Sequence, residues 1–434
     1  MIRSMNKIEQ QVLQDGIHFR SVQDTKFKTF RLSVNFLLPL KKETAAANAL
    51  IPFLLSRCSR EYPDFTQMSR KLASLYGASL GSNVGKLGSM QVLTISAGAI
   101  ADHYALQGEK LTAELTRVLC GAIFDPALEN GLFRENDFRQ EQRQTLEQID
   151  AEYNDKPSYA LKRCVEIMCA NEPYGISRYG SREDVQKLTS RQVTAAWKDM
   201  LRTARVEILA VGNLHPAPIA GALQEAFGKI ERAYRPVTET HTFHRLGEIP
   251  RVTEYQDVVQ GKMVLGMRVA VSQSNQEELV PAARLMNTIF GGTPNGKLFL
   301  NVREKMSLCY YCGSGYHAAS GLLFVQSGVE FANMAKAEKA ILEQLQAVQN
   351  GEFTEDDIAA AKRSMINNYQ TVGDSLVALE GWYLAQSLLP KVQTPEEYAE
   401  KVHAVGRDEI VQTAKGVQLD AVYCLKGQKE AAAK

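Results

Sequence analysis

The chain has 434 residues, which is enough for two or more domains with their own hydrophobic cores. Hydrophobic residues make up 45%, charged residues 23%, and the formal net charge is +1. This composition is that of an ordinary soluble protein, and it provides no basic field that would hold a nucleic acid or an anionic membrane.

The N-terminal stretch and the cysteines predict a cytoplasmic protein with reduced thiols. Residues 1–16 lack the apolar core of a signal peptide, and the longest apolar runs, such as Val34–Leu40, are too short to cross a bilayer. The seven cysteines are scattered and odd in number, which favours free thiols. Cys309 and Cys312 match a CxxC pattern, but a redox pair needs its first cysteine at a helix N-terminus, and no second CxxC completes a zinc site. We therefore interpret them as buried cysteines of a strand.

Hydrophobic periodicity predicts mixed strands and helices in the first half of the chain. Predicted strands cover residues 17–23, 30–40, two segments within 78–98, and 206–212. Predicted helices cover residues 44–60, 65–76, 103–124, 136–153, 161–168, 190–201 and 217–227. Ser190 is the expected N-cap of its helix.

The pattern breaks at residues 232–250, which have no apolar period and hold two prolines, so we predict an interdomain linker there. We interpret His241 and His244 as solvated residues of this linker. Further on, predicted strands cover residues 258–271, 308–312, 321–329 and 421–425. Predicted helices cover residues 276–290, 333–350, 356–369 and 396–416, and 299–311 starts as a helix and ends as a strand.

Two parts of the sequence repeat each other weakly. FRENDF at 133–138 and FTEDDI at 353–358 each open a charged helix, and residues 188–212 and 405–427 each form a predicted helix followed by a strand. The order of elements agrees, which predicts an α+β fold of two tandem homologous α/β modules, each a mainly antiparallel sheet covered by helices. The expected boundaries are 1–232 for the first module, 233–250 for the linker, and 251–434 for the second module.

Arg303 and Tyr310 stand seven residues apart after a Gly/Pro-rich turn at 291–296. An arginine brings a fixed fork of donors and a tyrosine a hydroxyl on a rigid ring, a pair suited to binding a peptide carbonyl or carboxylate. Spacing alone favours the alternative, a helix that docks on a sheet with an exposed arginine. The turn matches a phosphate-binding GxxxxGK loop only up to Leu298, which replaces the required Ser or Thr, so we expect no nucleotide site.

Several phrases resemble the pitrilysin/insulinase family of inverzincin metallopeptidases, and the resemblance covers nearly the whole chain. They are FGGTPNGKLFLNVREKMSLCYYCGSGY (290–316), VEILAVGNL (206–214), LASLYGASLGS (72–82) and the paired helix starts. The similarity is most specific at residues 298–310. The resemblance implies duplicated α/β halves, two or more of which close around a peptide.

The zinc site of that family lies in the first half, where an H-x-x-E-H helix supplies two ligands and a general base, and a later helix supplies a glutamate. In this chain the matching helix carries Leu50, Phe53 and Leu54 at those positions, and the dipeptide Glu-His occurs nowhere. Glu141 falls where the third ligand would lie, with Glu147 on the same helix. Without the histidines, we expect Glu141 to be a surface carboxylate and a remnant ligand at most. We predict no catalytic zinc in this chain.

In family members that work as paired modules, an arginine and a tyrosine seven residues apart help to bind the substrate, and Arg303 and Tyr310 match them. Tyr311 and Tyr316 are the alternatives if the strand is shifted. Some members divide the work between a zinc-bearing chain and a partner that keeps the Arg/Tyr pair. The resemblance implies a cytoplasmic peptidase homologue, inactive alone, that pairs with a zinc-bearing subunit and helps to bind a peptide substrate.

Other interpretations stay open. The chain could be a structural or scaffolding homologue with no role in proteolysis, or a self-sufficient peptidase with an unrecognised site. The isolated chain could form a homodimer in place of the pair.

Overall fold

The computed structural model describes residues 8–236 and 247–428. The chain divides into two compact units. Unit 1 comprises Met1–Ile149, Ile176–Thr238 and Val372–Val392, and unit 2 comprises Asp150–Gly175, Glu239–Thr371 and Gln393–Lys434. Each unit therefore includes a short segment from the other half of the sequence.

Unit 1 is built on a six-stranded sheet with the strand order β1-β2-β8-β3-β5-β4. The strands are β1 (Ile8–Gln14), β2 (Ile17–Gln23), β3 (Thr29–Pro39), β4 (Ser79–Leu87), β5 (Met90–Ile100) and β8 (Arg205–Gly212). All neighbours are antiparallel except β2 and β8, which run parallel. A separate hairpin joins β6 (Leu128–Glu129) and β7 (Leu132–Phe133).

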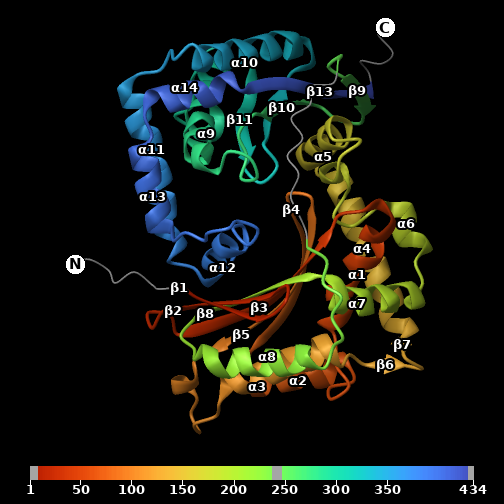
Figure 1. The fold of residues 1–434 in the computed structure, drawn as a ribbon. Coiled ribbons are helices and arrows are strands. Elements are labelled where there is room, and N and C mark those ends of the chain that lie inside the picture. The colour runs from red at the N-terminus through yellow and green to blue at the C-terminus, as the bar shows by residue number, and fades with distance from the viewer. Residues whose placement is uncertain (1–7, 237–246, 429–434) are drawn as a thin grey trace. The chain divides into compact units, whose positions relative to one another are not determined.

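Helices cover both faces of this sheet (Figure 1). They are α1 (Lys42–Leu55), α2 (Phe65–Ser74), α3 (Leu111–Phe124), α4 (Glu135–Asn154), α6 (Arg182–Lys187), α7 (Ser190–Thr203), α8 (Pro216–Gly228) and α12 (Leu376–Leu384). Side chains alternate across a strand, so Ile208 of β8 joins the main core, whereas Leu209 faces Leu379 and Tyr383 of α12. The second apolar face of β8 is thus buried by a helix from late in the sequence.

Unit 2 has a five-stranded sheet with the order β11-β12-β10-β13-β9, antiparallel except between β13 and β9. The strands are β9 (Arg251–Gln256), β10 (Gly261–Val269), β11 (Cys309–His317), β12 (Leu322–Val329) and β13 (Val417–Gly427). The helices are α5 (Lys156–Met168), α9 (Val280–Asn287), α10 (Met334–Gln349), α11 (Glu355–Val372), α13 (Pro395–Ala404) and α14 (Arg407–Lys415). Two π-helical segments, η4 (Thr288–Gly292) and η5 (Leu298–Lys305), follow α9.

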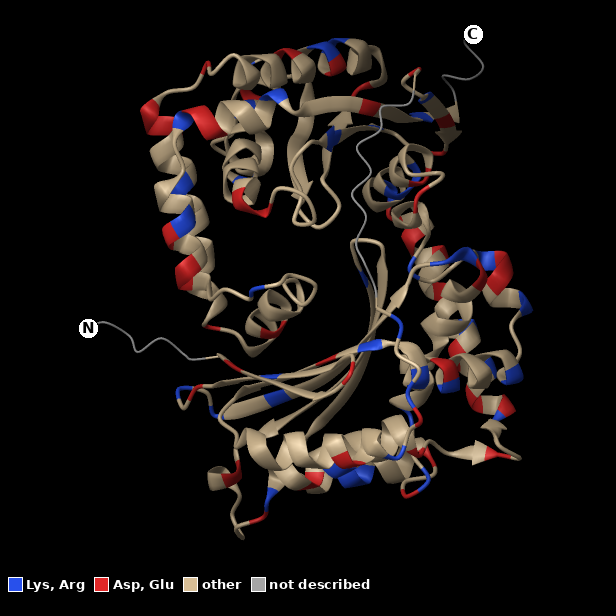
Figure 2. Cartoon of the chain, viewed as in Figure 1, with Lys and Arg blue, Asp and Glu red and all other residues tan. Residues whose placement is uncertain are grey.

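A helix from the other half of the sequence also covers the second face of this sheet. Cys164 and Met168 of α5 pack with Val264 and Phe324, while the remaining helices share the larger core on the opposite face. Short 3₁₀ turns lie at Asp102–Tyr104, Pro173–Gly175, Glu277–Leu279 and Phe331–Asn333. In Figure 2, charges of both signs are interspersed along α10 and α11. Within the described ranges, no helix combines the length and apolarity that a membrane crossing requires.

The predicted α+β fold of helix-covered, mainly antiparallel sheets is confirmed. Some predicted boundaries are wrong. The N-cap of α7 is Thr189, not Ser190, because Thr189 and Gln192 form a reciprocal capping box. The helix predicted over 103–124 begins only at Leu111, and the one over 396–416 is two helices separated at Gly406. His241 and His244 lie outside the described residues.

Candidate functional site

Helix α1 of unit 1 carries three apolar side chains where the family resemblance would place the metal ligands and the base. Its alanine-rich sequence favours a helix that packs closely on β5 and α7. Leu50 is fully buried, Leu54 is buried, and Phe53 is partly buried against the same core. These side chains have no atom that could ligate zinc or accept a proton, and their burial contributes to the core of the unit.

Glu141 is buried in unit 1, with 5% of its surface exposed, so the expectation of a surface carboxylate is wrong. The carboxylate lies on the inward face of α4 beside Phe138 and Thr145. Arg57, two residues beyond the end of α1, donates a hydrogen bond from Nη1 to Glu141 Oε1 at 2.6 Å. Burial raises the pKa of Glu141, and the hydrogen bond and charge of Arg57 oppose that rise.

Arg57 and Glu141 belong to a small ionic cluster at the junction of α1 and α4. Arg57 Nε lies 3.4 Å from Asp137 Oδ1, and Arg134 Nε donates to Asp137 Oδ2 at 2.8 Å. The two arginines balance the two carboxylates, so Glu141 has its counter-charge within the protein. Glu147, in contrast, is exposed and lies 3.7 Å from Arg143. No sequence pattern indicates the Arg57–Glu141 contact, because the partners are 84 residues apart.

The described parts of the chain contain no group of three or more His, Cys, Asp or Glu side chains placed to hold a metal ion. A hollow of about 360 Å³ in unit 1 does include Asp102, His103 and His215. However, Asp102 Oδ1 already accepts hydrogen bonds from Thr112 N at 2.7 Å and from Thr112 Oγ1 at 2.8 Å. The carboxylate therefore organises the start of α3.

In unit 2, Arg303 projects from the π-helical segment η5. Its guanidinium lies over the ring of Phe299, 4.4 Å from the centroid, and its Nε is 3.5 Å from Glu304 Oε1. The side chain is 39% exposed. π-Helical turns are rare and often occur at functional sites. Here the turn holds Val302 in the core and leaves Arg303 accessible, with the neighbouring Glu304 carboxylate within ion-pair distance.

Tyr310 is the extra residue of a β-bulge in the edge strand β11. Cys309 pairs with Val329 and Tyr311 with Gly328, so Tyr310 has no opposite residue in β12. Its surface is 63% exposed. Helical spacing does not relate Tyr310 to Arg303, because η5 ends at Lys305 and Ser307 turns the chain with a φ of 52°. The two residues instead lie on consecutive elements that pack against each other.

The two alternative tyrosines have packing roles of their own. The ring of Tyr311 covers Gly328 so closely that an added Cβ there would lie 2.5 Å from it, and Lys262 Nζ is 5.6 Å from the ring centroid. Burial raises the pKa of Tyr311 to about 12. Tyr316 donates its hydroxyl hydrogen to the Val271 carbonyl at 2.8 Å. Tyr310 is the one of the three whose side chain is largely exposed.

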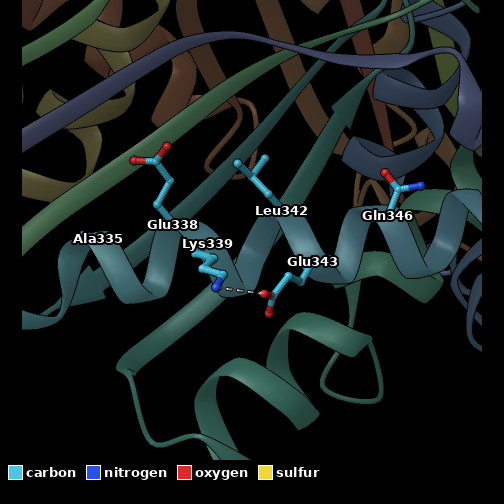
Figure 3. A pocket seen from close by; sticks show the side chains of 6 residues that line it. All are labelled: Ala335, Glu338, Lys339, Leu342, Glu343 and Gln346. Atoms are coloured by element: carbon cyan, nitrogen blue, oxygen red, sulfur yellow. Dashed lines mark ion pairs between the residues drawn. The ribbon is translucent and has the colours of Figure 1, made fainter.

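A larger hollow, of about 520 Å³, lies on α10 of unit 2 (Figure 3). Its lining residues all come from that one helix: Ala335, Glu338, Lys339, Leu342, Glu343 and Gln346. Lys339 and Glu343 form an ion pair at 3.8 Å, drawn as the dashed line. This surface contains neither Arg303 nor Tyr310 and gathers no catalytic group, so it is not the candidate site.

A duplicated α+β fold with leucine and phenylalanine in place of metal ligands defines a metallopeptidase-like protein without its zinc motif. Residues 187–365 match the family model described as Peptidase M16 inactive domain. The chain is 31% identical over 417 residues to "Probable inactive metalloprotease YmfF" of Bacillus subtilis (strain 168), covering 96% of this chain and 97% of that protein. The chain therefore belongs to the peptidase M16 family, which confirms the predicted resemblance.

Further relatives agree with this membership. "Uncharacterized zinc protease YmxG" of the same Bacillus strain is 22% identical over 422 residues, covering 93% of this chain and 94% of that protein. A crystal structure of a conserved protein from Enterococcus faecalis V583 superposes with a TM-score of 0.89 at 28% identity, covering 97% and 99% of the two chains. A peptidase M16 inactive domain from Pseudomonas fluorescens shares the fold, with a TM-score of 0.79 at 14% identity and coverage of 97% and 98%.

Proposed function

We propose that this protein is a catalytically incomplete M16 homologue that acts in the cytoplasm by pairing with a zinc-bearing M16 chain. The partner supplies the zinc, and this chain supplies Arg303 and Tyr310 to bind the peptide substrate. The duplicated modules proposed for this role are residues 1–232 and 251–434, joined by 233–250.

The observation that carries the proposal is the contrast between the two candidate places. In unit 1, α1 has buried apolar side chains in place of metal ligands, and Glu141 is neutralised by Arg57. In unit 2, the side chains of Arg303 and Tyr310 are accessible to solvent and are not part of the hydrophobic core. Exposed functional groups on a surface without a catalytic centre fit a chain that completes the site of another protein.

The two side chains suit a peptide by their chemistry. The guanidinium can donate two parallel hydrogen bonds to a carboxylate, or to carbonyl oxygens of an extended chain, and the phenol can donate to a third oxygen. Because the stacking on Phe299 fixes the arginine stem, less side-chain entropy is lost when the peptide binds.

The experiment mixes the purified chain with the zinc-bearing M16 homologue of the same organism and measures cleavage of a fluorogenic peptide library. We expect cleavage by the mixture and none by this chain alone. Arg303→Ala should reduce kcat/KM by about 10–100-fold, the equivalent of losing one or two charge-assisted hydrogen bonds. Tyr310→Phe should reduce it by about 5–10-fold, because one neutral hydrogen bond is lost.

Matched controls come from the same unit. Arg363 on α11 is exposed, and Tyr153, in the last turn of α4 that belongs to unit 2, is 48% exposed, so Arg363→Ala and Tyr153→Phe should leave cleavage unchanged. Size-exclusion chromatography with light scattering tests whether all variants still form the pair. A variant pair that assembles and cleaves as well as wild type when Arg303 is alanine would contradict the substrate contact. A tight complex with no cleavage by any metal-loaded form would favour the scaffolding alternative.

A further inference from the structure

The β-bulge at Tyr310 brings two cysteine side chains to the same side of β11. Residues three apart in a regular strand point to opposite faces, which would separate Cys309 from Cys312. Because Tyr310 is the extra residue, Cys309 takes the position two steps before Cys312 in the pairing with β12. Both side chains accordingly pack against the same core of unit 2.

The two thiols lie on the same face of β11, and they differ in exposure. The Cys312 thiol is buried, with 5% of the residue exposed, and it hydrogen-bonds to the sulfur of the half-buried Cys309. Their pairing partners in β12, Val329 and Ser327, are two residues apart. Cα atoms two residues apart in a strand are separated by about 6.6 Å. This is close to the upper end of the roughly 4.4–6.8 Å that a disulfide spans. The pair therefore has an accessible first thiol and a shielded second thiol within reach.

The charges around the pair favour a thiolate on Cys309. The hydrogen bond from Cys312 and the nearby Arg303 guanidinium lower the pKa of Cys309, while burial opposes them. The same hydrogen bond, together with burial, raises the pKa of Cys312. In contrast, burial raises the pKa of Cys424, a half-buried cysteine of β13, to about 11. Thiolate character and access together determine which cysteine an oxidant attacks.

We propose that Cys309 and Cys312 form a dithiol that peroxides oxidise reversibly to an intrachain disulfide, a modification site carried on the bulge of β11. The Cys309 thiolate attacks the peroxide, an S–O bond forms, the O–O bond breaks, and the leaving oxygen takes a proton to become an alcohol or water. The Cys312 sulfur, as it loses its proton, then attacks the Cys309 sulfenic acid. An S–S bond forms, the S–O bond breaks, and the hydroxide leaves as water.

Oxidation would act on the bulge between the two thiols, where Tyr310 and Tyr311 lie. The disulfide would fix the bulge that presents Tyr310, and it would remove the thiolate that faces Arg303. Dithiols reduce a disulfide by thiol–disulfide exchange, which would make the modification reversible. The thiol chemistry stands independently of the proposed peptide contact, because it depends only on unit 2 of this chain.

The test is mass spectrometry of the full-length reduced chain after a short exposure to hydrogen peroxide, with free thiols then alkylated. Trypsin releases Met306–Lys336 with Cys309 and Cys312 as its only cysteines. We expect this peptide to lose two hydrogens, to escape alkylation, and to regain both thiols after treatment with dithiothreitol. Cys424, in a separate tryptic peptide, should stay alkylatable at the same peroxide dose.

Two variants assign the roles of the thiols. In Cys312→Ser, Cys309 should stop as a sulfenic acid that a 1,3-diketone probe captures, whereas Cys309→Ser should leave Cys312 reduced. Cys424→Ser is the matched control and should form the disulfide as wild type does. The proposal is overturned if Met306–Lys336 keeps both thiols in wild type while Cys424 reacts. It is equally overturned if Cys309 gains oxygen without closing on Cys312.

Discussion

Replacing Arg57 with methionine tests the account of the lost metal site in unit 1. Methionine keeps most of the length of the side chain and removes its charge, so Glu141 stays buried with its hydrogen bond gone. Arg57 donates to Glu141 at 2.6 Å, and the two side chains are 16% and 7% exposed. We expect a large loss of stability, because an unpaired buried carboxylate must either stay charged in the low-dielectric protein interior or take up a proton.

The size of the loss follows from this burial. Removing one partner of a fully buried ion pair costs about 3–5 kcal/mol, and the partial exposure of Arg57 reduces this to about 2–4 kcal/mol. For a unit of this size, that corresponds to a fall in Tm of about 5–12 °C. Arg139→Met is the control. Arg139 donates to Glu135 at 2.7 Å on the same helix, but both side chains are more than half exposed, so the loss should stay below about 0.5 kcal/mol.

The assay is urea unfolding followed by circular dichroism at pH 7.5 and pH 5. Without Arg57, burial raises the pKa of Glu141 further above its unfolded value. The destabilisation is therefore full above the folded pKa, and it shrinks as the pH falls and the carboxyl is protonated. Adding Glu141→Gln to Arg57→Met should restore most of the lost stability. Equal losses in Arg57→Met and Arg139→Met, or a loss that does not change between the two pH values, would refute the reasoning.

Two further predictions concern unit 1. Burial, with smaller contributions from Arg205 and Arg20, lowers the pKa of His18 to about 4. Below pH 6.5 the unfolded chain therefore binds more protons than the folded chain does, and the free energy of unfolding decreases as the pH falls. His18→Gln should reduce the loss measured by urea unfolding between pH 7 and pH 5 by about 1 kcal/mol, after allowance for solvent around a half-buried ring. An unchanged pH slope would contradict this. Gly212→Ala should destabilise by about 2–3 kcal/mol, because φ is +110° and the new Cβ would lie 2.6 Å from the Thr29 carbonyl oxygen. Gly221→Ala, on an exposed turn of α8 with open space around it, should instead stabilise by about 0.5–1 kcal/mol, and thermal unfolding of both variants checks the pair.

Local patterns predict most elements of the fold because they depend on residues near in sequence. The alternating runs of β2 and β3 and the helical period of α2 lie close to their observed bounds. The predictions miss β1, β9 and the short helix α6. β1 is mostly exposed, so it has no alternation of buried side chains, and α6 has only six residues, of which Val185 alone is buried. The exchange of α5 and α12 between the units depends on packing over long distances along the chain, which no local pattern encodes.

For the candidate site too, the sequence predicts what depends on residue identity and not what depends on contacts between distant residues. The loss of the zinc motif is visible from Leu50, Phe53 and Leu54 alone, since it depends on residue identity. The burial of Glu141 is not, because it requires Arg57 from another helix to supply the counter-charge. The sequence also does not predict that Cys309 and Cys312 share a face of β11. Strand periodicity places residues three apart on opposite faces, and the bulge at Tyr310 brings these two to the same face.

The central claim is that this chain has no catalytic zinc of its own, and the metal content of the purified protein tests it most directly. The chain is dialysed against buffer with a small excess of zinc, freed of loosely bound metal on a desalting column, and measured by inductively coupled plasma mass spectrometry. The account predicts far less than one zinc per chain and no rise in Tm on adding zinc. For Glu141→Gln it predicts the same zinc content and the same lack of a zinc-induced rise in Tm. One zinc per chain that disappears in Glu141→Gln would contradict it.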